Sequence, residues 1–362
     1  MRIAIIGSRG IPNEYGGFEQ FAEYLSEGLA KKGCEVTVYA SDSNSYKKPE
    51  YKGVKLIHCY DPERTVGQFG QFIYDLICIL DSRKRNFDII YQLGYTSSAI
   101  WNWLFSKNAI LVTNTDGLEW QRSKYNRYVK KFLKYSEKTV ANRSDYLICD
   151  SQAIKKYIDK KYNKNAVCIS YGANLFKNPN EKFIHEFKLK PFQYFLVISR
   201  MQPDNNIETI IQGYINSESN YPMIIVGKLN NRYARRMESE YASDLVRFTG
   251  GIYDQHVLNN LRFYSTAYFH GHSAGGTNPS LLEAMAASAF ICAHNNPFNR
   301  EVLEDNAFYF TNSNDIEQFI NSNNDNDLRK MYLGNNNKQI QTNYSVSKVT
   351  AQYFEFFNKL KK

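Results

Sequence analysis

The sequence predicts an α/β protein in which each half of the chain forms a doubly wound parallel sheet. Short runs rich in β-branched residues alternate with amphipathic helical patterns in both halves, and such alternation is typical of parallel sheets. A polar stretch from Gly172 to Pro191 interrupts the alternation, as a linker between domains would. The length of 362 residues also favours two domains over one.

The expected elements follow from these periodicities. In the first half, strand-like runs occupy residues 2–6, 35–40, 54–59, 87–92, 109–114, 145–149 and 166–170. Helical patterns occupy residues 17–32, 68–83, 121–142 and 151–162. In the second half, strand-like runs begin at Phe195 and continue at 222–227, 245–249, 264–270 and 289–293, and residues 344–360 form an amphipathic helix.

These elements predict the domain organisation. We expect a first domain at 1–172, a linker at 173–190, a second domain at 191–340, and a C-terminal helix at 341–362 that crosses back to the first domain. Doubly wound sheets bind ligands beyond the carboxyl ends of their strands, so the turns after the strands are the places to search for a site.

Composition excludes several classes of protein. Hydrophobic residues make up 43% of the chain, which is ordinary for a globular protein. The six cysteines are scattered without metal-ligand or redox spacing, so we expect free thiols in a reducing cytosol. The first strand leaves no room for a signal peptide, and the longest apolar stretch, 67–80, is interrupted by Gln71 and Asp75. We therefore expect a cytoplasmic protein, soluble or peripheral on the inner face of the membrane.

The positive charge is concentrated in the first half. Residues 1–175 hold 26 Lys and Arg against 18 Asp and Glu, whereas the remainder holds 19 against 18. The first half therefore favours an anionic partner, or the charge only maintains solubility. Because no nucleic-acid-binding motif accompanies the charge, we do not expect nucleic acid as a partner.

The most informative segment follows the strand-like run 264–270 and reads Gly275-Gly-Thr-Asn-Pro-Ser-Leu-Leu-Glu-Ala-Met-Ala. Its two glycines allow close approach of a backbone to a ligand, and Asn278 and Pro279 are favourable first residues for a helix. The free amides at such a helix start form an anion site. Alternatively, Ser280 and Glu283 form an ordinary capping box that only starts the helix.

This helix start resembles the donor-binding motif of the retaining GT-B glycosyltransferases of family 4. The resemblance implies that Glu283 binds the hydroxyls of the nucleotide ribose. Glu283 matches the second glutamate of the motif. The first, which contacts the donor sugar in the family, is replaced here by Gly275, so the backbone amides of Gly276 and Thr277 are expected to substitute for it. The remaining donor contacts expected in this region are Gly276, Thr277, Asn278, Ser280 and His272.

A second match lies in the segment Val197-Ile-Ser-Arg-Met-Gln-Pro-Asp-Asn205, which resembles the part of the same family that holds the donor diphosphate. The resemblance implies that Arg200 contacts the diphosphate. The family's lysine is replaced by Asn205, and a charged hydrogen bond to phosphate contributes about 1.5–3 kcal/mol. A surface arginine at a strand end is the alternative for Arg200.

The first half resembles the bacterial polysaccharide rhamnosyltransferases, through Ile6-Gly-Ser-Arg-Gly-Ile-Pro, Tyr15-Gly-Gly-Phe-Glu and Asn114-Thr-Asp-Gly-Leu-Glu-Trp. Gly16 and Gly17 are expected to close over the donor phosphates, or to form only a helix-start turn. Asp116 and Glu119 follow a strand, and both are candidates to contact the acceptor hydroxyl. A capping or solvated carboxylate is the alternative for each of them.

Two other patterns suggest metal ligands but do not predict a metal site. His270 and His272 are two positions apart without a third ligand nearby. Asp325 and Asp327 resemble a metal motif of a different glycosyltransferase fold, but they precede a helix, where Asp is a capping residue. We therefore predict no metal and no cofactor other than the donor substrate.

The predicted helix at 121–142 is basic and contains interleaved aromatic residues. Arg127, Lys131, Lys134 and Lys138 recur at helical spacing and share one face. This face either contacts an anionic membrane or is only solvated.

Taken together, the motifs imply the GT-B fold, with two doubly wound Rossmann-like domains facing a central cleft. The implied reaction moves a sugar, with dTDP-L-rhamnose as the favoured donor, to a lipid-linked saccharide in capsule or O-antigen synthesis. Retention follows from the resemblance, and independence of metal is expected because Arg200 and the helix start at 278–280 can stabilise the diphosphate. The expected catalytic set is Asp116, Arg200 and Glu283. The alternatives are a sugar-nucleotide epimerase and a non-catalytic subunit that binds nucleotide sugars. The sequence does not define the oligomeric state.

Overall fold

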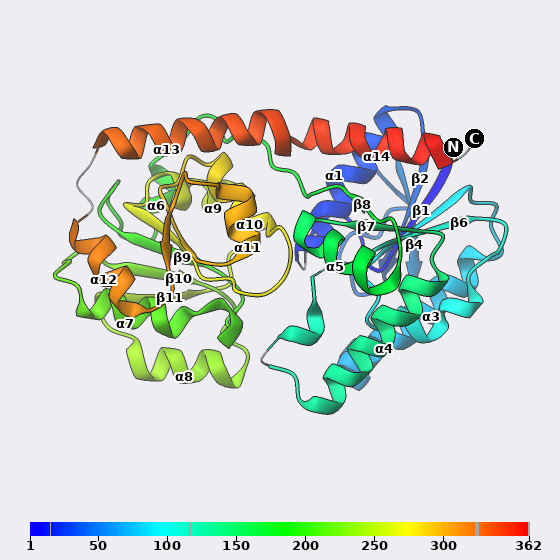
Figure 1. Ribbon diagram of the computed structural model, residues 1–362, viewed down its shortest axis with the longest axis horizontal. Helices are drawn as coiled ribbons and strands as arrows, with labels where there is room; N and C mark the ends of the chain where they lie inside the picture. The colour runs from blue at the N-terminus through cyan, green and yellow to red at the C-terminus, as the bar shows by residue number, and fades with distance from the viewer. Residues whose placement is uncertain (15, 116, 123, 323–325, 361–362) are drawn as a thin grey trace. The chain divides into compact units, whose positions relative to one another are not determined.

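The protein forms two compact units, each built around one parallel sheet. The computed structural model describes all residues except 15, 116, 123, 323–325 and 361–362 (Figure 1). The first unit comprises Met1–Trp120, Tyr125–Tyr171 and Val346–Lys362, and the second comprises Gln121–Lys124 and Gly172–Ser345. The predicted α/β class with two doubly wound sheets is confirmed.

The first sheet has the order β3-β4-β2-β1-β5-β6-β7-β8, and only β3 pairs in the antiparallel sense. Its strands are β1 (Arg2–Ile6), β2 (Glu35–Ser41), β3 (Glu50–Tyr51), β4 (Val54–Cys59), β5 (Ile89–Leu93), β6 (Ile110–Asn114), β7 (Tyr146–Cys149) and β8 (Val167–Cys168). Strand order reverses between β1 and β5, and ligands of doubly wound sheets bind at such a switch point. The loops after β1 and β5 are therefore where this unit should hold a ligand.

Helices cover both faces of the first sheet. They are α1 (Gly17–Lys31), α2 (Glu63–Val66), α3 (Gly70–Ser82), α4 (Arg127–Arg143), α5 (Gln152–Tyr162) and α14 (Val346–Leu360), with shorter 3-10 turns η1 (Gly67–Phe69), η2 (Ser98–Leu104) and η3 (Glu119–Gln121). Successive β5 residues point to opposite faces. Ile90 packs with α3, while Tyr91 contacts Phe21 of α1 and Tyr353 of α14, which lie side by side (Figure 1).

The second sheet has the order β11-β10-β9-β12-β13-β14. Its strands are β9 (Phe195–Ile198), β10 (Met223–Val226), β11 (Val246–Gly250), β12 (Ala267–His270), β13 (Ile291–His294) and β14 (Phe308–Phe310). The switch point here lies between β9 and β12. The loops that follow these two strands carry the Arg200 segment and the Gly275 segment of the sequence.

Helices α7 (Ile207–Asn216), α8 (Arg232–Tyr241) and α12 (Ser313–Ser322) cover one face of the second sheet and share an apolar core (Figure 1). The remaining helical segments are α6 (Lys182–His185), η4 (Pro203–Asn205), α9 (Gln255–Phe263), α10 (Pro279–Ala286), α11 (Pro297–Leu303), α13 (Asn326–Gln339) and η5 (Ile340–Tyr344). The stretch expected as a linker contains α6, and its Ile184 is buried within the second unit.

One helix boundary differs from the sequence expectation. The basic helix predicted for 121–142 begins only at Arg127, because the Asn126 side chain accepts hydrogen bonds from the backbone amides of Tyr128 and Val129. The described residues Gln121, Arg122, Lys124 and Tyr125 are therefore outside α4, and the first three group with the second unit. Among the described residues, no helix is long and apolar enough to cross a membrane.

Candidate functional site

The loops after β9 and β12 are joined into one edge of the second sheet. Both the backbone amide and the hydroxyl of Ser273 donate to the carbonyl of Asp204, at 3.0 and 2.8 Å. Asn206 donates to the carbonyl of Gly271 at 2.8 Å. A Cβ on Gly271 would lie 2.0 Å from the Asn205 carbonyl oxygen, so only glycine allows this close approach. The two motifs found in the sequence thus form a single surface.

Arg200 and Asn205 have different environments on this edge. The Arg200 side chain is exposed beyond the end of β9, where a cation can meet an anionic ligand. Asn205 is buried, and its amide donates a 2.6 Å hydrogen bond to the backbone carbonyl of Arg200. The residue that replaces the family's lysine therefore shapes the loop that presents Arg200.

The start of α10 decides between the two explanations of its sequence. Asn278 is the N-cap, since its side chain accepts from the backbone amide of Ser280 at 2.9 Å, and Pro279 is the first helical residue. Ser280 is therefore inside the helix, and the capping-box alternative is wrong. Gly275 has a φ of +115°, a conformation that a glutamate would adopt only with strain.

Glu283 forms an ion pair that the sequence did not indicate. Its Oε2 atom lies 2.5 Å from Nη2 of Arg262, a side chain from the last turn of α9 that is only 1% exposed. Arg262 also donates to Ser280 Oγ at 3.2 Å. No local pattern links positions 262 and 283, because packing of α9 beside α10 alone brings them together.

His270 and His272 stack at the end of β12, with ring centroids 4.4 Å apart. Burial, with the nearby charge of Arg262, lowers the pKa of His270 to about 3. Burial, His270, Arg200 and Arg122 lower the pKa of His272 well below its usual range, so both rings are neutral at pH 7. Arg122 was not predicted as a site residue; it reaches this edge because its segment packs with the second unit.

The described residues contain no group of three or more His, Cys, Asp or Glu side chains placed to hold a metal ion. Of the two aspartates that resemble a metal motif, Asp325 lies outside the described residues. Asp327 is in the first turn of α13, where its side chain pairs with Lys330 at 3.9 Å.

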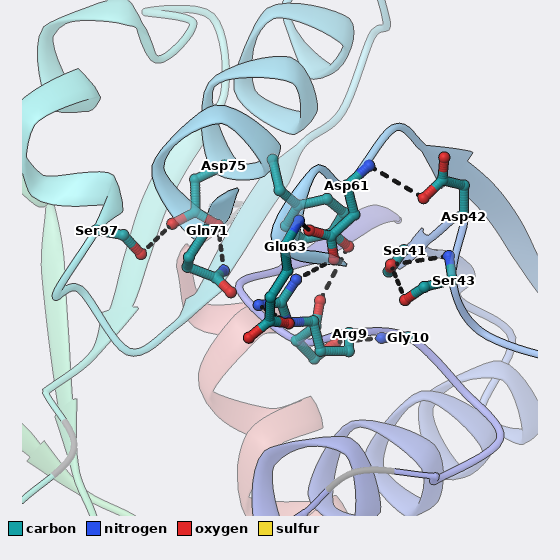
Figure 2. Close-up of polar contacts among 12 residues, drawn as sticks. Arg9, Gly10, Ser41, Asp42, Ser43, Asp61, Glu63, Gln71, Asp75 and Ser97 are labelled. Atoms are coloured by element: carbon teal, nitrogen blue, oxygen red, sulfur yellow. Dashed lines mark hydrogen bonds and ion pairs between the residues drawn. The ribbon is translucent and has the colours of Figure 1, made fainter. Parts of the chain in front are cut away.

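The switch point of the first sheet carries a charged cluster that the sequence reasoning missed (Figure 2). Arg9, which follows β1, pairs with Asp61 and, at 2.7 Å, with Glu63. Gly7 positions this loop, because its φ is +88° and a Cβ there would lie 2.3 Å from the Leu93 carbonyl oxygen. The glycine in the Ile6-Gly-Ser-Arg motif was the available signal.

Asp75 extends this cluster from α3. Its carboxylate accepts from Ser97 Oγ at 2.5 Å and from Gln71 Nε2 at 2.8 Å (Figure 2). Burial raises the pKa of Asp75 to about 6, although Ser97, Gln71 and Arg9 oppose the shift. Asp61 and Asp75 are buried in this cluster, whereas the Glu63 side chain is 32% exposed.

The other predicted residues of the first unit fall into three environments. Gly16 is the N-cap of α1 and Gly17 its first residue, and the buried Glu19 carboxylate at this helix start accepts from the Arg9 amide at 2.8 Å. Asp116 lies outside the described residues. Glu119 begins η3, where the neighbouring Trp120 donates to the buried Glu137 at 3.0 Å.

The predicted basic face of α4 is exposed. Arg127, Lys131, Lys134 and Lys138 are all accessible, and Lys134 also lies over the Trp120 ring at 4.3 Å.

Comparisons with known proteins agree with this architecture. Residues 1–174 match a domain of unknown function (DUF1972), and residues 178–339 match the family described as glycosyl transferases group 1. An uncharacterized glycosyltransferase of Methanocaldococcus jannaschii is 22% identical, with 95% of each chain covered.

Solved structures share the fold over nearly the whole chain. Sucrose-phosphate synthase from Thermosynechococcus elongatus has a TM-score of 0.82 at 16% identity, covering 99% of this chain and 98% of that one. HepE of Anabaena, solved with UDP and glucose, has a TM-score of 0.78 at 15% identity, covering 99% of each chain.

Two parallel-sheet units with this topology define the GT-B fold. The match of residues 178–339 to glycosyl transferases group 1, together with the relative matched along the whole chain, identifies the activity: the chain is a glycosyltransferase.

Proposed function

We propose that the protein is a retaining glycosyltransferase that takes its sugar from a nucleoside diphosphate and transfers it to a saccharide hydroxyl. The observation that carries the proposal is the single edge at the β9–β12 switch point, which combines Arg200, the start of α10 and Glu283. HepE, which shares the fold, was solved with UDP-glucose. In this assignment, the predicted second domain (residues 191–340) binds the donor and the predicted first domain (residues 1–172) binds the acceptor.

The chemistry follows from the groups on that edge. The bond between the anomeric carbon and the diphosphate oxygen breaks, and the acceptor oxygen forms the new bond on the same face of the sugar. The acceptor proton passes to the departing phosphate oxygen. Arg200 and the amides at the start of α10 stabilise the charge that grows on the diphosphate. Asp116 and Glu119 orient the acceptor hydroxyl in this proposal, and Gly16 and Gly17 close over the donor phosphates.

We take dTDP-L-rhamnose as the donor and a lipid-linked saccharide of capsule or O-antigen synthesis as the acceptor, because the first half resembles the polysaccharide rhamnosyltransferases. Such an acceptor is held at a membrane, and the first unit offers a matching surface. Phe69 and Trp103 are 76% and 64% exposed on η1 and η2, and the Phe69–Phe72–Phe132 ring contacts continue to basic α4. Aromatic and cationic side chains together are typical of surfaces that bind anionic membranes.

The test is transfer by the purified protein from dTDP-L-rhamnose, UDP-glucose and GDP-mannose to a short saccharide. We expect release of the nucleoside diphosphate that depends on the acceptor, and a product with the donor's anomeric configuration by NMR. An inverted product would contradict retention. We expect transfer to continue in EDTA, since Arg200 and the α10 start supply positive charge; loss restored by Mg²⁺ would contradict metal independence.

A further inference from the structure

Arg262 is a buried cation in the last turn of α9, and the proposed chemistry does not use it directly. Its side chain is 1% exposed, and burial of an unpaired guanidinium is strongly unfavourable. The partner is the carboxylate of Glu283, with 2.5 Å between Nη2 and Oε2. Glu283 itself is 13% exposed, so the pair joins the interior to the donor edge.

The guanidinium is held from several sides. Nη2 also donates to Ser280 Oγ at 3.2 Å, and Nη1 donates to Asn259 Oδ1 at 3.0 Å. Ser280 in turn shares a 3.0 Å hydrogen bond with the Tyr268 hydroxyl of β12. Ser280 and Glu283 are three residues apart on α10 and share a face. Glu283 therefore cannot change rotamer without leaving a buried cation unpaired.

Stability alone does not account for such a pair, because well-packed apolar side chains often replace buried ion pairs without loss. A carboxylate that binds hydroxyls benefits from the pair because it is already ordered before the ligand arrives. Glu283 lies one turn beyond the Asn278 cap, at the end of α10 assigned to the donor.

We propose that Arg262 is a positioning residue for donor recognition: it fixes the Glu283 carboxylate so that the site recognises hydroxyls of the donor's pentose. This inference rests on the proposed function, in which Glu283 faces the nucleotide pentose. A site built to bind a hydroxyl rejects an analogue that lacks it. Arg262 therefore governs selection of the pentose and has little effect on the affinity contributed by the diphosphate.

The experiment compares the affinities of dTDP and its 2′,3′-dideoxy analogue by calorimetry. dTDP differs from this analogue only in its 3′-hydroxyl. UDP, which carries both the 2′- and 3′-hydroxyls, is compared with 2′,3′-dideoxy-UDP in the same way. We expect the parent protein to prefer the hydroxylated ligand by roughly 10- to 100-fold. Arg262→Met should reduce this preference to about threefold or less while leaving the affinity for the dideoxy ligand nearly unchanged. Arg262→Lys should restore part of the preference.

Three further variants separate positioning from folding. In a Glu283→Gln background, Arg262→Met should change the preference no further, since both act through one carboxylate. Arg329→Met is the matched control: Arg329 is a partly buried arginine of the same unit, but it donates to the carbonyls of Thr266 and Ser265. It should keep the full preference. If Arg262→Met does not fold, the Arg262→Met/Glu283→Met double variant removes the pair without an unpaired charge.

The outcomes distinguish failure of the proposed function from failure of the positioning role of Arg262. If the parent binds no nucleoside diphosphate, the proposed function fails. If the parent prefers the hydroxylated ligand and a folded Arg262→Met protein keeps that preference, the positioning role is overturned and the proposed function stands. Equal binding of both ligands by the parent also overturns the positioning role.

Discussion

The side-chain amide of Asn205 donates a 2.6 Å hydrogen bond to the backbone carbonyl of Arg200. Asn205 is 3% exposed, while the Arg200 side chain projects into solvent. The position that holds a lysine in the family motif thus has a structural role in this protein. The positive charge expected from that lysine is not available at position 205, so in the proposed reaction Arg200 and the start of α10 stabilise the leaving group without it.

Asn205→Lys should therefore not improve donor binding. The longer, charged side chain does not fit the buried position, and the Arg200 carbonyl loses its donor, so we expect a loss of about 1–3 kcal/mol in the free energy of unfolding. Urea unfolding and donor titration measure the two effects. Asn216→Lys adds the same charge at an exposed position of α7 and should change neither. Tighter donor binding at unchanged stability would show that the lysine site is intact.

Arg200→Ala should lower turnover more than it weakens donor binding. The diphosphate gains negative charge as its bond to the sugar breaks, so a cation beside it stabilises the transition state more than the ground state. We expect kcat to fall on the order of 100-fold, with a small change in KM for the donor. Arg235→Ala, at an exposed position on α8, serves as the control. A rise in KM alone would refute this role.

Asp75 should make stability depend on pH in the direction opposite to most carboxylates. Burial raises its pKa in the folded protein to about 6, from an ordinary 3.8, so between these values the folded state holds a proton that the unfolded state has released. Its contribution to stability is then lost as pH rises through this window, by about 3 kcal/mol in total.

Asp75→Asn should remove that loss, so the variant gains stability relative to the parent between pH 4 and pH 7. Urea unfolding at several pH values measures the difference. Asp159→Asn is the control for the direction of the pH dependence. Burial raises the pKa of Asp159, but hydrogen bonds from Lys155 and the Ala166 amide outweigh that effect, so the pKa is lowered. That variant should lose stability relative to the parent as pH rises. Parallel pH profiles for the parent and Asp75→Asn would contradict the assignment.

The basic face of α4 should bind anionic membranes. Each cation near such a surface contributes about 1 kcal/mol, and salt screens the attraction. We expect the parent to sediment with anionic vesicles at low salt, to detach as salt rises, and to ignore neutral vesicles. Exchange of Arg127, Lys131, Lys134 and Lys138 for Gln should abolish sedimentation and spare transfer to a soluble acceptor.

A charge-matched control separates this face from net charge. Lys84, Lys107, Lys156 and Lys160 are exposed elsewhere on the same unit, and their exchange for Gln should leave most binding intact. Trp103→Ser should weaken binding at intermediate salt, where part of the parent still sediments, because the change removes an exposed apolar side chain. Equal sedimentation of the α4 variant and the parent would mean that this face is only solvated.

The sequence predicted most of the fold because its signals were local. The β-branched run at residues 2–6 became β1 with the same bounds, and the glycines and Asn278 marked the start of α10. The start of α4 was misplaced, since continuous basic and aromatic residues hid the cap at Asn126. The short strand β14 and helix α12 were also missed.

The candidate site was less predictable because tertiary contacts create it. Arg262 and Glu283 are 21 positions apart, and neither local sequence indicates that they form an ion pair. Asp75 had a signal that was interpreted only as an interruption of an apolar run. Gln71 and Asp75 are four residues apart on the buried side of α3 and bond to each other, a spacing that indicates a satisfied polar pair in a helix.

The measurement that tests the central claim most directly is thermal unfolding of the purified protein with a panel of sugar nucleotides, led by dTDP-L-rhamnose and UDP-glucose. A ligand at 100 times its Kd stabilises the folded state by about 2.7 kcal/mol. The account predicts that at least one sugar nucleotide raises Tm and that Glu283→Gln diminishes the shift. Unchanged Tm with every sugar nucleotide and nucleoside diphosphate at millimolar concentration would contradict the account.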